Sequence, residues 1–152
     1  MLAALAEGRT RLENFASGAD CASTLGCVEA MGCRVVRGPG GAIEIEGRGA
    51  ALSPPTGPLD CGNSGSTIRM LSGILAGQRF SSELAGDQSL SRRPMQRIIE
   101  PLSAMGAHID SSGGRPPLRI RGEHLKGIAY KLPVASAQVK TCLLFAGLLA
   151  EG

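Results

Sequence analysis

The feature that most constrains the fold is an internal repeat with a period of about 70 to 75 residues, too long for a solenoid. Ala30–Gly32 recurs as Ala104–Gly106, and the alternating segment Ile43–Gly47 recurs as Leu118–Gly122. In both places a short Ala-Met-Gly ending precedes a strand-like alternation of apolar and charged residues, which predicts a half-exposed strand. The chain is therefore expected to use one supersecondary unit more than once.

An apolar helix ending supports this interpretation because it occurs three times. Leu2–Gly8 matches Leu71–Gly77 and again Phe145–Gly152. A period of this length suits a compact βαβαββ unit, so we expect an α/β (α+β) protein with repeated units around a pseudo-threefold axis. The first copy starts within a helix and the third stops after that same helix. We therefore expect residues 1–152 to be a single domain truncated at both ends, with a second domain absent.

Turn residues and periodicity place the expected elements within these copies. Asp20 or Ser17 is the predicted cap of the first long helix, and Pro94 is predicted in the first turn of a later one. The predicted helices are residues 1–6, 21–31, a segment closing at 70–77, and 94–105, and the predicted strands are residues 9–15, 34–37, 42–46, 78–84, 107–110 and 118–121.

The segment Gly62–Arg69 is the strongest candidate for a binding site. It is rich in glycine and hydroxyl residues and runs directly into an apolar helix, with Asn63, Ser64 and Ser66 as cap candidates. A helix that begins here directs free N–H groups and the positive end of its dipole at whatever lies in front of it. Arg69 adds a full positive charge, so the junction suits a phosphate or a carboxylate.

A second junction has the same chemistry. Before the third apolar helix, Ser136 is the predicted cap, with Gln138 and Lys140 in the first turn. The turns before equivalent helices should gather at one face of a pseudo-symmetric domain, so the two junctions are expected to bind anions side by side in a shared cleft. Lys140 is equally well explained as a solvated helix lysine.

The segment Gly86–Arg97 adds further cations. Arg93 immediately precedes Pro94 at the start of a helix, and its planar guanidinium suits bidentate contact with a carboxylate or phosphate. Asp87 is placed to orient one of the arginines. Arg92 and Arg97 are more simply explained as solvated.

Composition narrows the function. A net charge of +3 fits an anionic small molecule, and three phenylalanines with one tyrosine are too few aromatics for base stacking, which disfavours nucleic acid. The five cysteines form no Cys-x-x-Cys pair, so we expect no metal site and reduced thiols in a cytoplasmic protein. No apolar run is long enough for a membrane span. No acid–base pair stands out, which suggests a binding half whose chemistry another half completes.

With these residues described, the chain resembles the 5-enolpyruvylshikimate-3-phosphate synthases, the enolpyruvyl transferases of the shikimate pathway of aromatic amino-acid biosynthesis. The resemblance rests on Leu59–Arg69, Gly86–Met95 and Ala135–Lys140, in the family's order and spacing. It covers only the N-terminal-side domain of that two-domain enzyme, whose fold is a set of βαβαββ units around a pseudo-threefold axis. The family moves the enolpyruvyl group of phosphoenolpyruvate to the 5-hydroxyl of shikimate 3-phosphate, as a transferase without a metal or organic cofactor.

The resemblance also implies roles for single residues. Asn63, Gly65 and Ser66 would line the phosphoenolpyruvate site, and Arg93 would bind that substrate's phosphate. Arg69 matches a family arginine near the same opening.

For shikimate 3-phosphate, the resemblance implies that Ser136 contacts the phosphate and Gln138 contacts the ring. Asp20 falls where the family has an acidic residue near the cleft.

The family's Lys-Ser-x-Ser-x-Arg segment, expected just before Met1, is absent, as are the carboxylates and arginines of the second domain. We therefore expect this chain to be inactive alone and to need that domain, either in the same parent chain or as a separate polypeptide. Two alternatives stay open: a domain of a UDP-N-acetylglucosamine enolpyruvyl transferase, and a non-catalytic truncated module for binding or assembly, including an RNA-contacting unit.

Overall fold

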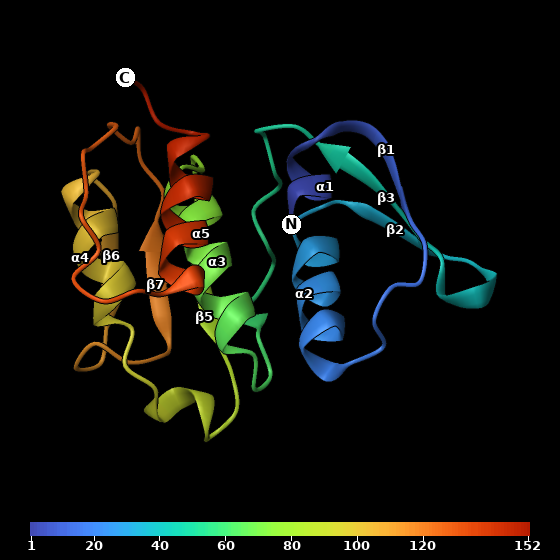
Figure 1. The fold of residues 1–152 in the computed structure, drawn as a ribbon, viewed down its shortest axis with the longest axis horizontal. Coiled ribbons are helices and arrows are strands. Elements are labelled where there is room, and N and C mark those ends of the chain that lie inside the picture. Colours follow the sequence, from blue (N-terminus) through green and yellow to red (C-terminus); the bar gives the residue numbers. More distant parts are fainter.

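The computed structural model describes residues 1–152, which form one complete βαβαββ unit flanked by parts of two others (Figure 1). The elements are α1 (Leu2–Leu5), β1 (Glu7–Leu12), α2 (Ala19–Ala30), β2 (Arg34–Arg37), β3 (Ile43–Arg48), β4 (Leu59–Asp60), α3 (Gly65–Ala76), β5 (Ser81–Ala85), α4 (Gln96–Ala104), β6 (His108–Ser111), β7 (Leu118–Arg121) and α5 (Ala137–Gly147), with short 3-10 turns at Pro39–Gly41 and Leu90–Arg92.

Two sheets with matching topology confirm the predicted repeat. The complete unit runs from β4 to β7 in the spatial order β4-β5-β7-β6, where β4 and β5 are parallel and the other pairs are antiparallel. The preceding sheet has the order β1-β3-β2, again antiparallel, which is the same arrangement without the first strand. A third unit begins with a parallel bridge between Lys126 and Glu151, on either side of α5.

Equivalent glycines show how closely the first two units correspond. A Cβ built on Gly47 would lie 2.1 Å from the Ala6 carbonyl oxygen, and one on Gly122 would lie 1.9 Å from the Gln78 carbonyl oxygen. Each glycine therefore lets a strand pass against the end of its own unit's first helix. These contacts make Ala6 the structural equivalent of Gln78, whereas the alignment of the repeated sequences pairs Ala6 with Leu75.

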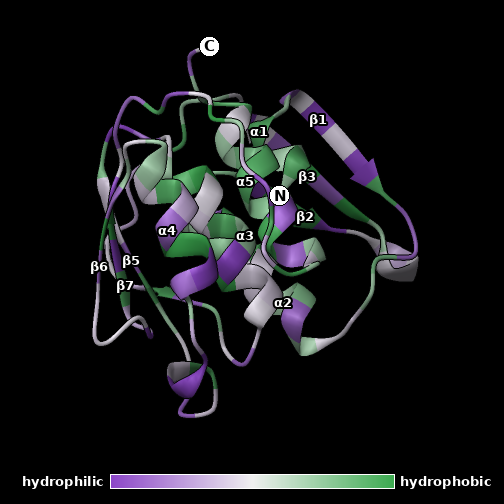
Figure 2. Ribbon diagram, turned by 60° about the vertical axis from the view of Figure 1, so that its left-hand side comes forward, coloured by the Kyte–Doolittle hydropathy of each residue, from purple (hydrophilic) through white to green (hydrophobic).

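The core lies around α3, which packs between α2 and α4 and against α5 (Figure 2). Ile68, Leu71, Ile74 and Leu75 are fully buried, consistent with the apolar segment predicted to close this helix. The axes of α3 and α5 come close because Gly73 has no side chain: a Cβ there would lie 2.0 Å from the carbonyl oxygen of Cys142.

Several helix and strand boundaries differ from those that the sequence predicted. Strands 34–37 and 118–121 match the prediction, but neither Asp20 nor Ser17 caps α2; its N-cap is Gly18, without a side-chain cap bond, and Asp20 lies in the first turn. Pro94 precedes α4 rather than lying in its first turn: the N-cap is Met95, whose N–H donates to the carbonyl oxygen of Gly114 at 2.8 Å.

Further boundaries also differ. The strand predicted at residues 9–15 is Glu7–Leu12, the strand predicted from residue 78 begins at Ser81, and α5 ends at Gly147 rather than near Gly152.

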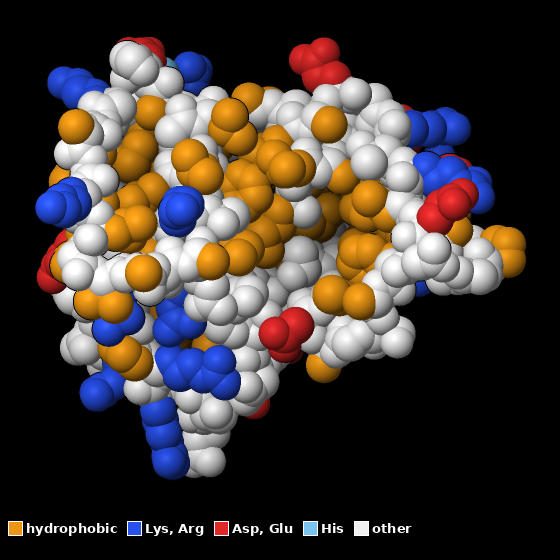
Figure 3. Space-filling model, viewed as in Figure 1, with side chains coloured by type: hydrophobic (Ala, Val, Ile, Leu, Met, Phe, Trp, Pro, Cys, Tyr) orange, Lys and Arg blue, Asp and Glu red, His pale blue; other side chains and the backbone are white.

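None of the helices combines the length and the hydrophobicity that a membrane span requires. One face is nevertheless apolar: Leu2 on α1, Leu144 on α5 and Leu148 just after it are each more than 60% exposed. Figure 3 shows hydrophobic side chains gathered on the face that α1 and α5 share.

Candidate functional site

The site begins with helices whose N-terminal ends lie on the same side of the molecule (Figure 1). Ser64 caps α3 by accepting a hydrogen bond from the Thr67 N–H at 3.1 Å, and Ser136 caps α5 by accepting one from the Val139 N–H at 3.4 Å. The prediction that Ser136 is a cap is thus confirmed, and Ser64 is the cap among the three candidates before α3. Both helices therefore present free N–H groups to the same region.

Gln138 connects these two helix starts. Its side-chain carbonyl oxygen accepts a hydrogen bond from Nη1 of Arg69 at 2.8 Å, and its amide nitrogen donates to Oγ of Ser66 at 2.9 Å. Residues separated by about seventy positions in the chain thus become neighbours. The structure brings together three of the residues that the sequence nominated separately.

Arg93 joins the same cluster from the start of α4. Its Nη2 donates to the Oδ1 of Asn63, and Nη2 of Arg69 donates to the Pro94 carbonyl at 3.2 Å. A Cβ built on Gly65 would lie 2.7 Å from Nη1 of Arg69 and 3.0 Å from Nη1 of Arg93. Both guanidinium groups therefore lie against Gly65, and a side chain at that position would displace them.

The positive charge of this cluster is not neutralised within the chain. Burial lowers the pKa of Arg69, and the neighbouring charges of Arg93 and Arg97 lower it further. None of these three arginines has a carboxylate within salt-bridge distance, whereas Arg37 binds Glu29 and Arg119 binds Glu83, each at 2.8 Å. Convergent cations that pair only with neutral oxygens are arranged to receive an anion.

Asp87 lies at the edge of the cluster. Its Oδ2 accepts a hydrogen bond from Nδ2 of Asn63 at 2.7 Å, and its Oδ1 accepts from the Leu90 N–H at 2.8 Å. The bond from Asn63 is the main reason that the pKa of Asp87 lies below its ordinary value, followed by the bond from Leu90. The carboxylate therefore stays ionised at neutral pH and is a poor proton donor.

The first turn of α2 reaches the site through its backbone. The carbonyl oxygen of Asp20 lies 3.0 Å from Oγ1 of Thr24 and 3.3 Å from Oγ1 of Thr67, and the two threonine hydroxyls are 2.7 Å apart. Asp20 is thereby held beside α3, with its carboxylate exposed and outside the arginine cluster. Sequence reasoning missed both threonines, because the residues around Thr24 and those around Thr67 do not indicate a partner on another helix.

Lys140 does not join the cluster. It lines a different cavity of about 460 Å³, together with Tyr130 and Leu144 on the outer side of α5. Its explanation as a solvated helix lysine fits this position better than a role at the shared anion site.

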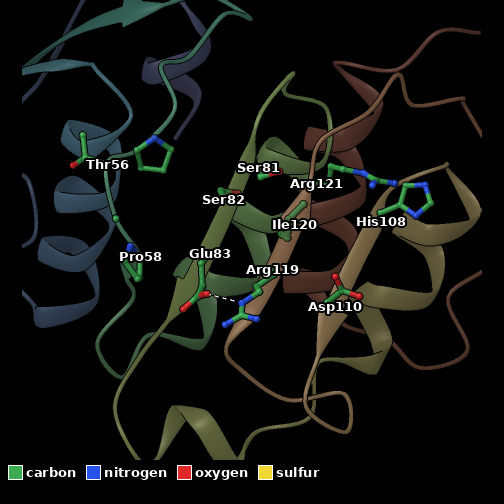
Figure 4. Close-up of a pocket in the computed structure, with 12 residues that line it drawn as sticks. Thr56, Pro58, Ser81, Ser82, Glu83, His108, Asp110, Arg119, Ile120 and Arg121 are labelled. Atoms are coloured by element: carbon green, nitrogen blue, oxygen red, sulfur yellow. Dashed lines mark hydrogen bonds and ion pairs between the residues drawn. The ribbon is translucent and has the colours of Figure 1, made fainter.

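Another cavity, of about 670 Å³, contains none of the predicted site residues. It lies over the outer face of β5, β7 and β6 and is bordered by the connector before β4 (Figure 4). Its charges largely compensate one another, as in the pair of Arg119 with Glu83 that Figure 4 marks. The uncompensated cations lie instead at the helix starts.

Repeated βαβαββ units with cationic helix starts define the class: the protein has an enolpyruvyl-transferase-like fold. The family model described as EPSP synthase (3-phosphoshikimate 1-carboxyvinyltransferase) matches residues 1–152, and the chain belongs to this family.

Individual relatives agree with the family match. The chain is 59% identical to the 3-phosphoshikimate 1-carboxyvinyltransferase of Koribacter versatilis and 56% identical to that of Solibacter usitatus, with all of this chain covered. The solved structure of EPSP synthase from Acinetobacter baumannii aligns over 99% of this chain and 35% of its own, with a TM-score of 0.96 and 47% identity.

The chain spans about 36% of the length of the curated relatives that it matches. These matches do not favour the alternatives of a UDP-N-acetylglucosamine enolpyruvyl transferase or a non-catalytic module.

Proposed function

We propose that residues 1–152 are the substrate-binding part of an EPSP synthase, which transfers the enolpyruvyl group of phosphoenolpyruvate to the 5-hydroxyl of shikimate 3-phosphate. The observation that carries this proposal is the placement of Arg69 and Arg93 against Gly65, without a carboxylate partner for either. Both substrates carry a phosphate and a carboxylate, so each presents anionic groups to such a cluster. Membership of the EPSP synthase family supports phosphoenolpyruvate and shikimate 3-phosphate as these substrates.

For phosphoenolpyruvate, we assign the phosphate to Arg93 and to the free N–H groups at the start of α3. Asn63 and Ser66 would hydrogen-bond the same substrate, and Gly65 would leave room for it between the two guanidinium groups. Arg69 would contribute charge at the same opening.

For shikimate 3-phosphate, we assign the phosphate to Ser136 at the start of α5 and the ring to Gln138. Both polar ends of Gln138 are satisfied by Arg69 and Ser66, so binding would exchange one of these bonds for a substrate hydroxyl. Asp20 would lie at the edge of the cleft.

We also propose that residues 1–152 form one domain of a longer protein, whose remaining parts include the second domain of the enzyme. The exposed Leu2, Leu144 and Leu148 support this proposal, since a soluble surface rarely keeps large apolar side chains together. All five cysteines are free, which fits a cytoplasmic location.

The isolated chain should bind the two substrates but should not catalyse the transfer. It offers cations and amides but no proton donor placed near them, and protonation of the substrate's methylene carbon requires one. A coupled phosphate-release assay on the purified 152-residue chain should give no rate above background. Sustained phosphate release from both substrates together would contradict this expectation.

The sharpest test uses a complete enzyme that contains this chain, with residues 1–152 replacing the matching segment of the Koribacter versatilis relative. Arg93→Ala should raise the KM for phosphoenolpyruvate by about tenfold to a hundredfold, the equivalent of one or two lost charged hydrogen bonds. The KM for shikimate 3-phosphate should change much less. Arg9→Ala, an exposed arginine on β1, is the control and should change neither.

A larger effect of Arg93→Ala on shikimate 3-phosphate than on phosphoenolpyruvate would overturn the assignment of Arg93. A chimera that folds but accepts UDP-N-acetylglucosamine in place of shikimate 3-phosphate would overturn the proposed substrate.

A further inference from the structure

Two loops of the site are joined at Asp87. The Asp87 N–H donates to the carbonyl oxygen of Gly62 at 2.9 Å, and a Cβ built on the preceding Gly86 would lie 2.5 Å from that same oxygen. The loop after β5 therefore packs directly on the loop before α3. This contact brings the carboxylate of Asp87 beside the side chain of Asn63.

The hydrogen bonds of the Asn63 amide fix its orientation. Its nitrogen donates to Oδ2 of Asp87, and its oxygen accepts from Nη2 of Arg93. An ionised carboxylate can only accept hydrogen bonds and a guanidinium can only donate them, so rotation of the amide by half a turn would break both contacts. The other carboxylate oxygen of Asp87 is held by the Leu90 N–H, which prevents the carboxylate from turning away.

We propose that Asp87 is a positioning residue of the phosphate site. It fixes the Asn63 amide with its oxygen toward Arg93, and thereby holds the Arg93 guanidinium against Gly65. The identity of the bound phosphate as phosphoenolpyruvate rests on the proposed function. The orientation of Asn63 and Arg93 does not depend on that identity, because residues of the chain itself form the hydrogen bonds that fix it.

The Asn63 amide separates the negative charge of Asp87 from the positive charge of Arg93. A carboxylate in direct contact with Arg93 would neutralise it and compete with a phosphate for the same N–H groups. Asp87 contacts Asn63 instead, and Asn63 is neutral. The arrangement therefore orients the guanidinium while leaving its positive charge available to a ligand.

Asp87→Asn tests the proposal, with Asp110→Asn as a matched control. Both changes remove one negative charge from an exposed aspartate, and Asp110 lies on β6 at the outer sheet face. If Oδ1 of the new asparagine keeps its bond to Leu90, its NH₂ group faces that of Asn63, and the Asn63 amide must rotate or move away. The Arg93 contact is then lost.

The first measurement is NMR of the ¹⁵N-labelled 152-residue chain without ligand. Asp87→Asn should shift the Asn63 side-chain NH₂ and Arg93 Nε–H resonances, while amide resonances of the buried α3 residues stay in place. Asp110→Asn should leave both side-chain resonances unchanged. Unchanged Asn63 and Arg93 resonances in Asp87→Asn would overturn the proposal whatever the chain binds.

The second measurement is a titration with phosphoenolpyruvate, followed on the same resonances. Asp87→Asn should weaken binding about tenfold, the loss of about one hydrogen bond to a charged group. Because Asp87 acts through Asn63, Asp87→Asn should weaken binding by less than about twofold in a chain that already carries Asn63→Ala. Equal effects in both backgrounds would show that Asp87 does not act through Asn63 and would overturn the proposal.

Failure of the proposed function has a different signature. If the unaltered chain does not respond to phosphoenolpyruvate but Asp87→Asn still shifts the Asn63 and Arg93 resonances, the positioning role stands and the substrate assignment falls. Should Asp87→Asn not fold, Asn63→Ala alone decides the matter: it keeps the Asp87–Leu90 bond and must still shift the Arg93 Nε–H resonance. An unchanged Arg93 resonance there overturns the proposal.

Discussion

The two helices α2 and α4 occupy equivalent places in neighbouring units, and they end in the same way. Met31 and Met105 follow them and are buried, and Gly32 and Gly106 then adopt positive φ values of 87° and 104°. Only glycine takes this conformation without strain, so both helices turn into their next strand through the same residue type.

Their N-terminal ends differ. The chain enters α2 through Gly18 with Asp20 in the first turn, whereas it enters α4 through Arg93, Pro94 and Met95. One end is acidic and the other carries the arginine that contacts Asn63. The C-terminal ends of the two helices are alike because both pack into the core. Their N-terminal ends face solvent, where residues of different charge are tolerated. The repeat therefore defines the scaffold, and the departures from it define the site.

The strongest test of the structural equivalence uses Gly47 and Gly122. Either glycine changed to alanine would place a Cβ about 2 Å from a backbone carbonyl oxygen that cannot move aside. We expect each substitution to lower the free energy of unfolding by about 3 kcal/mol, and Tm by roughly 6 to 12 °C. Thermal unfolding followed by circular dichroism measures both.

Gly57→Ala is the control for these substitutions, since no atom lies within 4 Å of a Cβ at that position. It should leave Tm nearly unchanged. If Gly47→Ala were tolerated and Gly122→Ala were not, the two units would not share the same helix-to-strand packing, and the equivalence would be limited to the order of elements.

The serine caps of α3 and α5 allow a second comparison, between the second and third units, with a smaller expected loss of stability. Ser64 is fully buried and its Oγ lies 3.1 Å from its N–H donor, whereas Ser136 is partly exposed and its Oγ lies 3.4 Å from its donor. Ser64→Ala should cost about 2 kcal/mol and Ser136→Ala about 0.5 kcal/mol. Urea unfolding of both variants measures the difference, and equal losses would contradict the ranking.

The repeat made much of the fold predictable. Apolar and glycine residues recur at matching positions, so the strands at 34–37 and 118–121, the cap at Ser136 and the βαβαββ order could be predicted without a structure. The start of α2 could not, because Ser17, Gly18 and Asp20 are all acceptable near an N-cap and only the backbone path selects among them.

Sequence reasoning selected the residues of the candidate site one by one, but it did not predict the contacts between them. Arg69, Arg93 and Gln138 each stood out through charge or position, yet nothing local indicates that Gln138 bridges Arg69 and Ser66. Such contacts depend on how α5 packs on α3, which is fixed by Gly73. The same limit explains Lys140: its spacing from Ser136 suggested a second cation at the site, but helix geometry turns it to the outer side of α5.

A third test uses a position where α2 carries glycine in its exposed interior. A Cβ at Gly26 would meet no atom within 4 Å, and the residue has an ordinary helical conformation. Gly26→Ala should therefore raise the free energy of unfolding by about 0.5 to 1 kcal/mol, and Tm by roughly 2 °C. In α4 no such gain is available, because the matching position carries Glu100. A fall in Tm would show that α2 needs flexibility that α4 does not.

The smallest expected effect concerns the ion pair of the first unit. Glu29 at the end of α2 accepts two hydrogen bonds from Arg37, at 2.8 and 3.1 Å, which are the main reason that the pKa of Glu29 lies below its ordinary value. A carboxyl group whose pKa is lower in the folded state stabilises the fold above its unfolded pKa, and that contribution is lost as the pH falls through the folded pKa. Arg37→Ala should thus lower Tm at pH 7 by less than Gly26→Ala raises it, because the Arg37 side chain is largely exposed and that of Glu29 is partly exposed. The difference in Tm between the original chain and Arg37→Ala should shrink as the pH falls through the lowered pKa of Glu29 and vanish once Glu29 is protonated. A chain with Glu29→Gln cannot titrate at this position, so adding Arg37→Ala to it should change Tm equally at every pH. If the effect of Arg37→Ala on Tm in the original chain persisted unchanged to low pH, Arg37 would stabilise the unit by packing rather than by charge.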